Sequence, residues 1–483
     1  MKQHYIVLDG LRGAAALMVL WYHVFEGFAF AGGTMIETFN HGHLGVDFFF
    51  MLSGFVISYA YDDRWKTTRP QDYKTTSLGQ KSVSVSVSES ESKSESESES
   101  ASASESVSES ASESASESAS ESKSESVSAS ASASKVSVRV NVWSFFKRRL
   151  VRLQPMVVMG AFIGLITYLI QGGVRWDGTP MSFHWIMMAF LFAMFLIPVH
   201  PGAPYDVRGN GEMYPLNGPS WSLFFEYIGN ILYALFIRKL SDRSLAFLCG
   251  ITGILWIAFV TCDISGYDMI GIGWTLDAVN FFGGLLRMLF PFILGMLMSR
   301  RFRDKRRKAN DKRLMAKDKC QCLSLSQCLS QCLSLSQSHS QSLFYFSVIV
   351  MFVLFSMPYI TKTGSISLNG IYEISCIILV FPAIIWFGAA ANITNSFTTK
   401  LCKFLGDISY PLYIVHYPVM YLFYSWLIDN ELYTLGATWH VVLLVMATNI
   451  ALAYACLKLY DEPVRRRLNS ELRTKNSDYR RRH

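Results

Sequence analysis

The feature that most constrains this chain is a series of apolar segments, each about 17–22 residues long, separated by polar stretches. At a rise of 1.5 Å per residue, a helix of that length spans the ~30 Å hydrocarbon core of a bilayer. Only helices and closed barrels satisfy every backbone polar group in lipid, and the apolar runs are continuous rather than alternating, which argues against a barrel. The sequence, 51% hydrophobic over 483 residues, therefore predicts an all-α, polytopic membrane helix bundle.

About ten spans are expected, and an even number places both termini on the same side of the membrane. Residues 182–198 are apolar as well, but a crossing there would put the basic group around Arg238 outside, so we expect a re-entrant or interfacial segment. The ten predicted spans are 8–28, 44–61, 153–170, 219–237, 245–262, 280–299, 343–360, 370–390, 409–427 and 438–458.

Basic residues set the predicted orientation, because Lys and Arg concentrate in cytoplasmic loops. Basic groups occur around Arg149 and Arg152, between Arg300 and Lys319, and after Arg465. We therefore expect cytoplasmic N- and C-termini, and location in the bacterial inner (plasma) membrane. The first span is interrupted by Arg12 and His23, which favours a retained signal anchor over a cleaved signal peptide.

Two low-complexity segments interrupt the predicted membrane domain. Residues 81–135 are a Ser-X repeat that cannot bury apolar area, so we expect a disordered cytoplasmic insertion. Residues 303–342 are basic and then rich in Cys, Ser and Gln, and we predict a second cytoplasmic insertion. The membrane domain is thus expected in three parts, 1–80, 136–302 and 343–464, followed by a basic tail, 465–483. We expect no metal site, either in the cysteine-rich repeat or at His41 and His43.

The first span carries four ionisable residues, Asp9, Arg12, His23 and Glu26, within an arc of about 100°. Charged groups inside a bilayer usually face a bundle interior or a cavity, although an ion-pair network that only fixes packing would look the same. Arg12 and His23 lie roughly 16–17 Å apart along this face. A phosphate-bearing donor held at Arg12 could therefore reach His23 with a flexible arm such as that of coenzyme A.

Six motifs occur along the chain: LDGLRGAAALMVLWYH, GHLGVDFFFMLSGFVIS (42–58), FFKRRLVRLQP (145–155), PSWSLFFEYIGN (219–230), LGDISYPLYIVHYPV (405–419) and DEPVRR. Together they resemble the acyltransferase 3 family of integral membrane acyltransferases. The resemblance implies transfer of an acyl group, usually acetyl, from acyl-coenzyme A to a hydroxyl of a glycan or similar carbohydrate. The expected partners are then acyl-coenzyme A (acetyl-coenzyme A above all) as donor substrate, a glycan or polysaccharide acceptor and the lipid bilayer, with no permanently bound cofactor and no nucleic acid.

Three arginines are candidates for binding the donor: Arg12, Arg149 and Arg152. Guanidinium groups at the inner surface suit coenzyme A phosphates, although Arg149 and Arg152 would equally serve as a positive-inside anchor. His23 is the candidate general base, because the pKa of imidazole lies near working pH. A transient acyl-histidine is the less favoured variant.

Two carboxylates complete the candidate catalytic set. Asp47 lies at the depth of His23 and either orients its imidazole or is a helix N-terminal acid. Glu226 is predicted to bind the acceptor or handle a proton, with Arg287 as its partner, or to form a structural ion pair. The family element around Glu226 usually continues with a second acid, which this chain lacks, so the acceptor class stays open. Ser53 could donate a hydrogen bond, although a small packing residue is the favoured reading. His416 is read as a packing residue with an open alternative.

Two other functions fit intramembrane charges. A transporter or flippase for a glycan-related substrate would have paired repeats and Gly- or Pro-broken helices, and the sequence has no clear internal repeat. A non-catalytic membrane scaffold is the other alternative. Acylation of surface glycans in cells carrying His23→Ala would separate the three.

Overall fold

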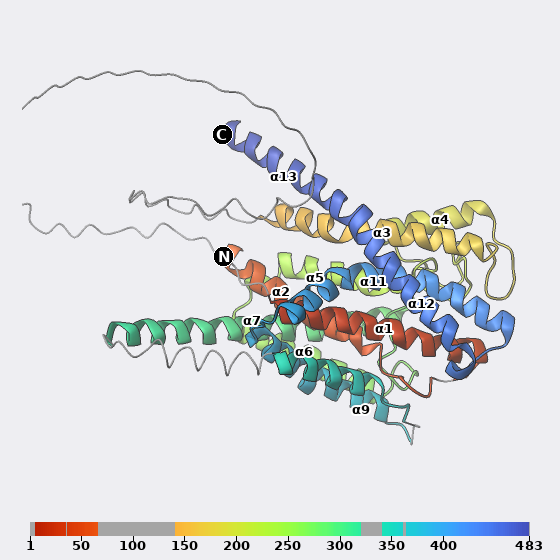
Figure 1. The fold of residues 1–483 in the computed structure, drawn as a ribbon, viewed down its shortest axis with the longest axis horizontal. Coiled ribbons are helices and arrows are strands. Elements are labelled where there is room, and N and C mark those ends of the chain that lie inside the picture. The colour runs from red at the N-terminus through yellow and green to blue at the C-terminus, as the bar shows by residue number, and fades with distance from the viewer. Residues whose placement is uncertain (1–4, 35, 66–140, 320–340, 361–363, 483) are drawn as a thin grey trace, which may run out of the picture. The chain divides into compact units, whose positions relative to one another are not determined.

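The fold is a bundle of helices, seen in a computed structural model that describes residues 5–34, 36–65, 141–319, 341–360 and 364–482 (Figure 1). In these residues the only β pairing is two isolated bridges, Val174 with Pro180 and Glu212 with Thr275. The predicted all-α membrane bundle is confirmed. The helices are α1 (Ile6–Gly32), α2 (Leu44–Trp65), α3 (Val142–Ile170), α4 (Phe183–Phe195), α5 (Ser220–Leu235), η1 (Ile237–Lys239), α6 (Asp242–Thr261), α7 (Ala278–Lys319), Gln341–Phe355, α9 (Leu368–Ser375), η2 (Cys376–Val380), α10 (Phe381–Ala390), α11 (Ser396–Asn430), α12 (Leu435–Ala455), η3 (Cys456–Asp461) and α13 (Glu462–Arg482).

Eight helices in the described part of the chain are long and apolar enough to cross a membrane, against ten predicted spans. The other two expected spans take different forms. Residues 409–427 lie inside α11, which has 35 residues, and residues 343–360 fall on the shorter helix Gln341–Phe355. The apolar segment 182–198 forms α4, whose 13 residues reach only ~20 Å, short of the ~30 Å hydrocarbon core.

The two predicted insertions fall largely outside the described residues. Residues 81–135 lie outside them entirely, as does the Cys/Ser/Gln repeat at 320–340. The basic stretch that was expected to begin the second insertion instead continues α7 as far as Lys319, and the basic tail lies in α13. Charged residues with good helix propensity can extend a transmembrane helix beyond the bilayer.

Glycine contacts bring the central helices unusually close. A Cβ at Gly13 of α1 would lie 2.2 Å from the backbone oxygen of Leu405 on α11, and a Cβ at Gly406 would lie 2.6 Å from Cβ of Asp9. A Cβ at Gly54 of α2 would lie 2.0 Å from the backbone oxygen of Phe292 on α7. Small residues at such crossings are the usual means by which membrane helices pack. They place the polar face of α1 against α11.

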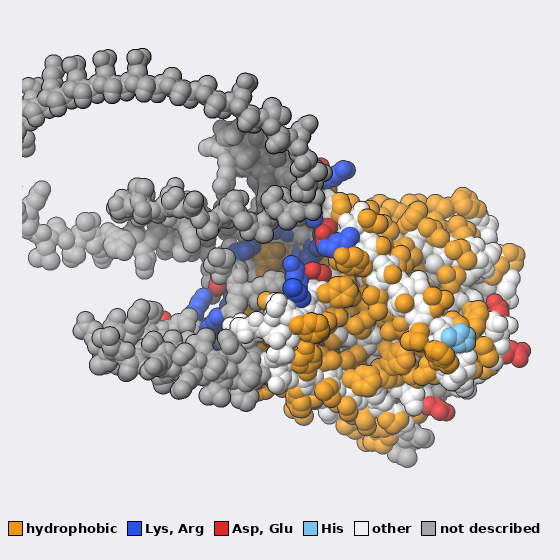
Figure 2. Space-filling model, viewed as in Figure 1, with side chains coloured by type: hydrophobic (Ala, Val, Ile, Leu, Met, Phe, Trp, Pro, Cys, Tyr) orange, Lys and Arg blue, Asp and Glu red, His pale blue; other side chains and the backbone are white. Residues whose placement is uncertain are grey.

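The surface agrees with a membrane protein. On the visible face, hydrophobic side chains cover the flank of the bundle, and Lys and Arg side chains gather at one end (Figure 2). Arg238, Arg300 and Arg303 line one hollow together, and we call the end of the bundle that holds this hollow the basic end. There Arg300 and Arg303 both contact Asp62, with N–O distances of 2.9 and 3.0 Å.

Candidate functional site

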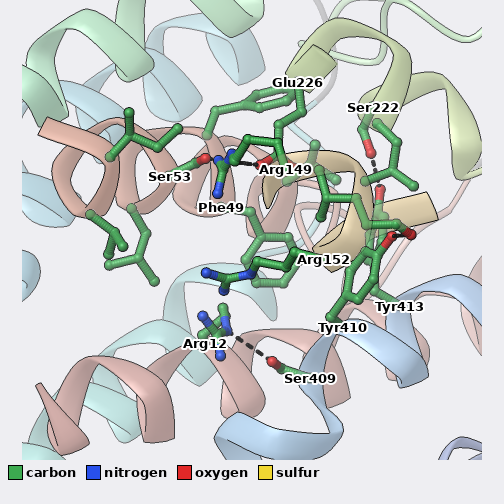
Figure 3. A pocket seen from close by; sticks show the side chains of 17 residues that line it. Arg12, Phe49, Ser53, Arg149, Arg152, Ser222, Glu226, Ser409, Tyr410 and Tyr413 are labelled. Carbon is green, nitrogen blue, oxygen red and sulfur yellow. Dashed lines mark hydrogen bonds and ion pairs between the residues drawn. The ribbon is translucent and has the colours of Figure 1, made fainter. Parts of the chain in front are cut away.

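Three arginines converge on one cavity, which we call the arginine pocket. Arg12 comes from α1, and Arg149 and Arg152 come from α3 (Figure 3). The sequence predicted all three as donor-binding residues, and the structure brings them together. The other polar residues that line this cavity are Ser53, Ser222, Glu226, Ser409, Tyr410 and Tyr413.

The arginines are held in different ways. Nε of Arg12 donates to Oγ of Ser409 at 2.8 Å, and its Nη2 donates to the backbone oxygen of Gly406 at 3.0 Å. Nε of Arg149 donates to Oδ1 of Asn230 at 3.0 Å. Arg152 makes no ion pair with any carboxylate of the described residues. The pocket therefore keeps positive charge available for an anion.

Glu226 lies in the arginine pocket, whereas the sequence predicted that it would pair with Arg287. Its Oε1 is 3.4 Å from Nη2 of Arg149 and accepts a hydrogen bond from Oγ of Ser53 at 2.9 Å. The predicted pairing with Arg287 is wrong because α5 turns Glu226 toward α2 and α3. Ser53 is therefore more than a packing residue: it positions the carboxylate that faces Arg149.

His23 lines a second cavity further from the basic end, which we call the histidine pocket. It encloses about 1420 Å³ including its open mouth, and it is also lined by Glu26, His43, Asn210, Glu212 and Arg287. Aromatic rings form much of the remaining wall. They include Trp176, Trp221, Trp274, Tyr417, Tyr421 and Tyr424.

The imidazole of His23 is held by Glu26, three residues further along α1. Nδ1 of His23 lies 2.6 Å from Oε2 of Glu26. The same carboxylate oxygen accepts hydrogen bonds from the hydroxyls of Tyr424 at 2.9 Å and Tyr417 at 3.2 Å. With Nδ1 engaged by a carboxylate, Nε2 is the nitrogen left to accept a proton, which is the arrangement of a general base and its orienting acid.

Asp47 does not orient His23. Its carboxylate is fully buried and contacts Arg287 on α7, with Nη2–Oδ2 and Nε–Oδ1 distances of 2.8 and 3.0 Å. The close packing of α2 against α7 directs Asp47 away from α1. Of the two predicted roles of Asp47, contact with the imidazole is wrong, and Glu26 takes that place. The other, an acid in the first turn of its helix, is confirmed by the position of Asp47 in α2. Asp47 instead neutralises the arginine that lines the histidine pocket.

The two pockets adjoin. Val46 and Tyr413 line both of them. The hydroxyl of Tyr413 lies 2.7 Å from Oγ of Ser222, so this shared wall is polar on the side of the arginine pocket. The arginine pocket and the cavity that contains His23 therefore share part of one wall.

Two loops contribute side chains to the wall of the histidine pocket. One, residues 196–219, contributes Asn210 and Glu212, and the other, residues 262–277, contributes Trp274. An isolated bridge joins Glu212 to Thr275, and the amide of Met213 donates to the backbone oxygen of Trp274 at 2.8 Å. Burial raises the pKa of Glu212 to about 7, and the phenol of Tyr421 donates to its carboxylate.

Sequence reasoning missed several residues of this pocket. Tyr417, Tyr421 and Tyr424 recur at spacings of four and three, which places them on one face of a helix, and this signal was available. Glu212 lies in an irregular loop, where no periodicity points to a site. His416 lies beside His23, with ring centroids 5.1 Å apart, but its Nδ1 is bonded to backbone oxygens and it lines neither pocket.

His41 and His43, which were considered as metal ligands, instead share a carboxylate. His41 and His43 both contact Oε1 of Glu373, at 2.7 and 2.8 Å. In the described part of the chain, no group of three or more His, Cys, Asp or Glu side chains is arranged to hold a metal ion. The cysteine-rich repeat lies outside the described residues.

Comparison with known families decides the class of the protein. Residues 5–79 and 135–458 match the model of the acyltransferase 3 family, described as an acyltransferase domain. The chain belongs to the acyltransferase 3 family. It is accordingly a membrane acyltransferase, and the match omits residues 80–134, most of the Ser-X repeat. No curated protein and no solved structure matches the chain.

Proposed function

We propose that this acyltransferase moves an acyl group, acetyl in the first place, from acyl-coenzyme A to a hydroxyl of a cell-surface glycan. The observation that carries the proposal is the pair of adjoining pockets, one with three arginines and the other with the His23–Glu26 pair. Arginine suits phosphate because its planar fork of N–H donors matches phosphate oxygens. The aromatic wall of the second pocket suits the apolar faces of sugar rings.

In the proposed reaction the donor phosphates bind Arg12, Arg149 and Arg152, and the thioester lies at the wall formed by Val46 and Tyr413. Nε2 of His23 takes the proton from the acceptor hydroxyl, whose oxygen attacks the thioester carbonyl. The carbon–sulfur bond breaks and the thiolate leaves. His23 returns the proton to the thiolate, so the products are an ester and free coenzyme A.

The proposed location follows from charge. The basic end would face the cytoplasm of a bacterial inner membrane, with both termini on that side. Acyl-coenzyme A would then enter the arginine pocket from the cytoplasm, and the glycan would enter the histidine pocket from the other face. The 16–17 Å that separate Arg12 from His23 along α1, at about 1.5 Å per residue, suit the arm of coenzyme A.

Two variants test this division of roles in purified protein. Arg152→Ala should weaken acetyl-coenzyme A binding by about tenfold or more. The variant should stay folded, because Arg152 forms no ion pair with a carboxylate of the described residues. His23→Gln should bind the donor normally and lose transfer by roughly 10²–10⁴-fold.

Equilibrium binding of the donor and release of free coenzyme A are the two measurements. Lys147→Ala is the matched control for Arg152, because it removes a nearby positive charge on α3 that does not line the pocket. The division of roles fails if Lys147→Ala weakens binding as much as Arg152→Ala, or if His23→Gln transfers acyl groups at the normal rate.

A further inference from the structure

Glu212 is a buried carboxylate that the proposed reaction does not use. It is 8% exposed and lines the histidine pocket together with His23 and Glu26. The phenol of Tyr421 donates to its Oε2, and the side chain of Asn210 is a further hydrogen-bond partner of the carboxylate. The bridge to Thr275 holds the backbone of Glu212 in place. Because the two oxygens of a carboxylate offer about four acceptor sites, Glu212 can still accept hydrogen bonds from a ligand in the pocket.

The charges that line this pocket are mainly acidic. Arg287 is the only Lys or Arg among its described lining residues, and its guanidinium is bonded to Asp47 and to backbone oxygens of His43 and Ile272. Glu26 and Glu212 are the two carboxylates that remain. Arg208 lies close by, but it stacks on Tyr421, 3.5 Å from the ring centroid, and donates to the backbone oxygen of Pro215.

We propose that Glu212 binds hydroxyl groups of the acceptor and makes the pocket select an uncharged sugar over an acidic one. The inference rests on the proposed function, because it assumes that the acceptor enters the histidine pocket. A carboxylate accepts hydrogen bonds from neighbouring sugar hydroxyls. The aromatic rings of Trp176, Trp221 and Trp274 contact the apolar face of the ring. At a pH above about 7, where Glu212 is ionised, an acidic sugar would bring a third negative charge into a partly desolvated site. Such like-charge contacts are a strong basis for rejection.

The test measures sugar binding without donor, on the full-length protein in detergent, from the fluorescence of the tryptophans that line the pocket. It is made at about pH 8.5, above the pKa of about 7 of Glu212, so that this carboxylate is charged. The probes are two matched pairs: methyl β-glucoside with methyl β-glucuronide, and methyl β-galactoside with methyl β-galacturonide. The members of each pair differ only in that a carboxylate replaces the 6-hydroxymethyl group. The wild type should bind at least one neutral member about tenfold more tightly than its acidic partner.

Glu212→Gln should weaken binding of the neutral glycoside and reduce the preference to within about threefold, because the amide keeps the shape but removes the negative charge. Asp206→Asn is the control: its carboxylate accepts backbone amides of Gly202, Gly209 and Gly211 in the same loop, and it does not line the pocket. It should leave the preference unchanged.

Three results would overturn the inference. They are binding of neither neutral glycoside, equal binding of the acidic partners by the wild type, and the same change in Asp206→Asn as in Glu212→Gln. Donor binding and His23-dependent transfer are measured separately, so each of these outcomes leaves the proposed function standing. Loss of the proposed function would instead appear as His23→Gln with normal transfer.

Discussion

At the scale of single residues, the chemistry depends on which carboxylate meets which cation. His23 is held by Glu26, Asp47 by Arg287, and Glu226 by Arg149 and Ser53. Glu26 and His23 are three residues apart on one helix, so their contact follows from helix geometry alone. The other pairs join different helices, and their side chains were assigned to the wrong partners from sequence.

Glu26→Gln tests the role of the carboxylate beside His23. The variant should keep the donor and acceptor KM values and lower kcat on the order of 10²-fold, because an amide neither fixes the tautomer nor stabilises the imidazolium. Tyr424→Phe is the control, since it removes one hydrogen bond to Glu26 and keeps the negative charge. A kcat within twofold of the wild type in Glu26→Gln would remove Glu26 from the mechanism. The pH–rate profile adds a readout that a purely structural defect would not shift.

The raised pKa of Glu212 predicts that the stability of the folded protein depends on pH. Burial raises its pKa from 4.5 to about 7 against the lowering effects of Tyr421, Arg208 and Asn210, and Glu26 on α1 raises it further. The folded state thus holds this proton more tightly than the unfolded chain, so the stabilising contribution is present below pH 4.5 and is lost as pH rises through about 7. The full loss is ~3 kcal/mol, from the difference between those two pKa values at 1.36 kcal/mol per unit.

The measurement is the thermal unfolding midpoint of the wild type and of Glu212→Gln in detergent between about pH 5 and pH 8.5. The midpoint of the variant, relative to that of the wild type, should rise as pH increases, because glutamine does not titrate. A constant difference across this range would show that the carboxyl group does not have a raised pKa.

At the scale of helices, the close packing of α1 against α11 forms part of both pockets. Gly13 and Gly406 let the two backbones approach closely. Arg12 then reaches Ser409, and Tyr417 and Tyr424 reach Glu26. The sequence indicated the small residues of the first span, but it did not identify α11 as the helix that packs against them. That choice depends on contacts between residues about 400 positions apart in the chain.

Gly13→Ala should lower the stability of the protein by roughly 1–3 kcal/mol, because the added methyl group would clash with the backbone of α11. Gly250→Ala makes the same change on α6, where a Cβ meets no atom within 4 Å. There the helix propensity of alanine should be neutral or stabilising, by up to ~1 kcal/mol. Thermal unfolding in detergent compares the two variants. Equal unfolding midpoints of the two variants would contradict the close packing of α1 against α11.

At the scale of the whole molecule, the residues of both pockets lie in the part of the chain that matches the family, and most of the Ser-X repeat lies outside it. The family match leaves out residues 80–134. Removal of residues 81–135, with 66–80 and 136–140 kept as the linker, should leave the unfolding midpoint and the transfer rate within about twofold of the wild type, since a Ser-X repeat buries no apolar surface. A large loss in either measurement would show that the repeat contributes to the folded enzyme.

The sequence by itself determined the class of the fold, because apolar segments of membrane-spanning length leave the backbone no alternative to helices in lipid. It also determined that Arg12, His23 and Glu26 share a face, since that follows from 3.6 residues per turn. The tertiary structure alone decided that Glu226 joins the arginines, that Asp47 belongs to Arg287, and that Glu212 enters the pocket of His23. Contacts between helices and loops depend on how whole surfaces pack, and no local periodicity encodes them.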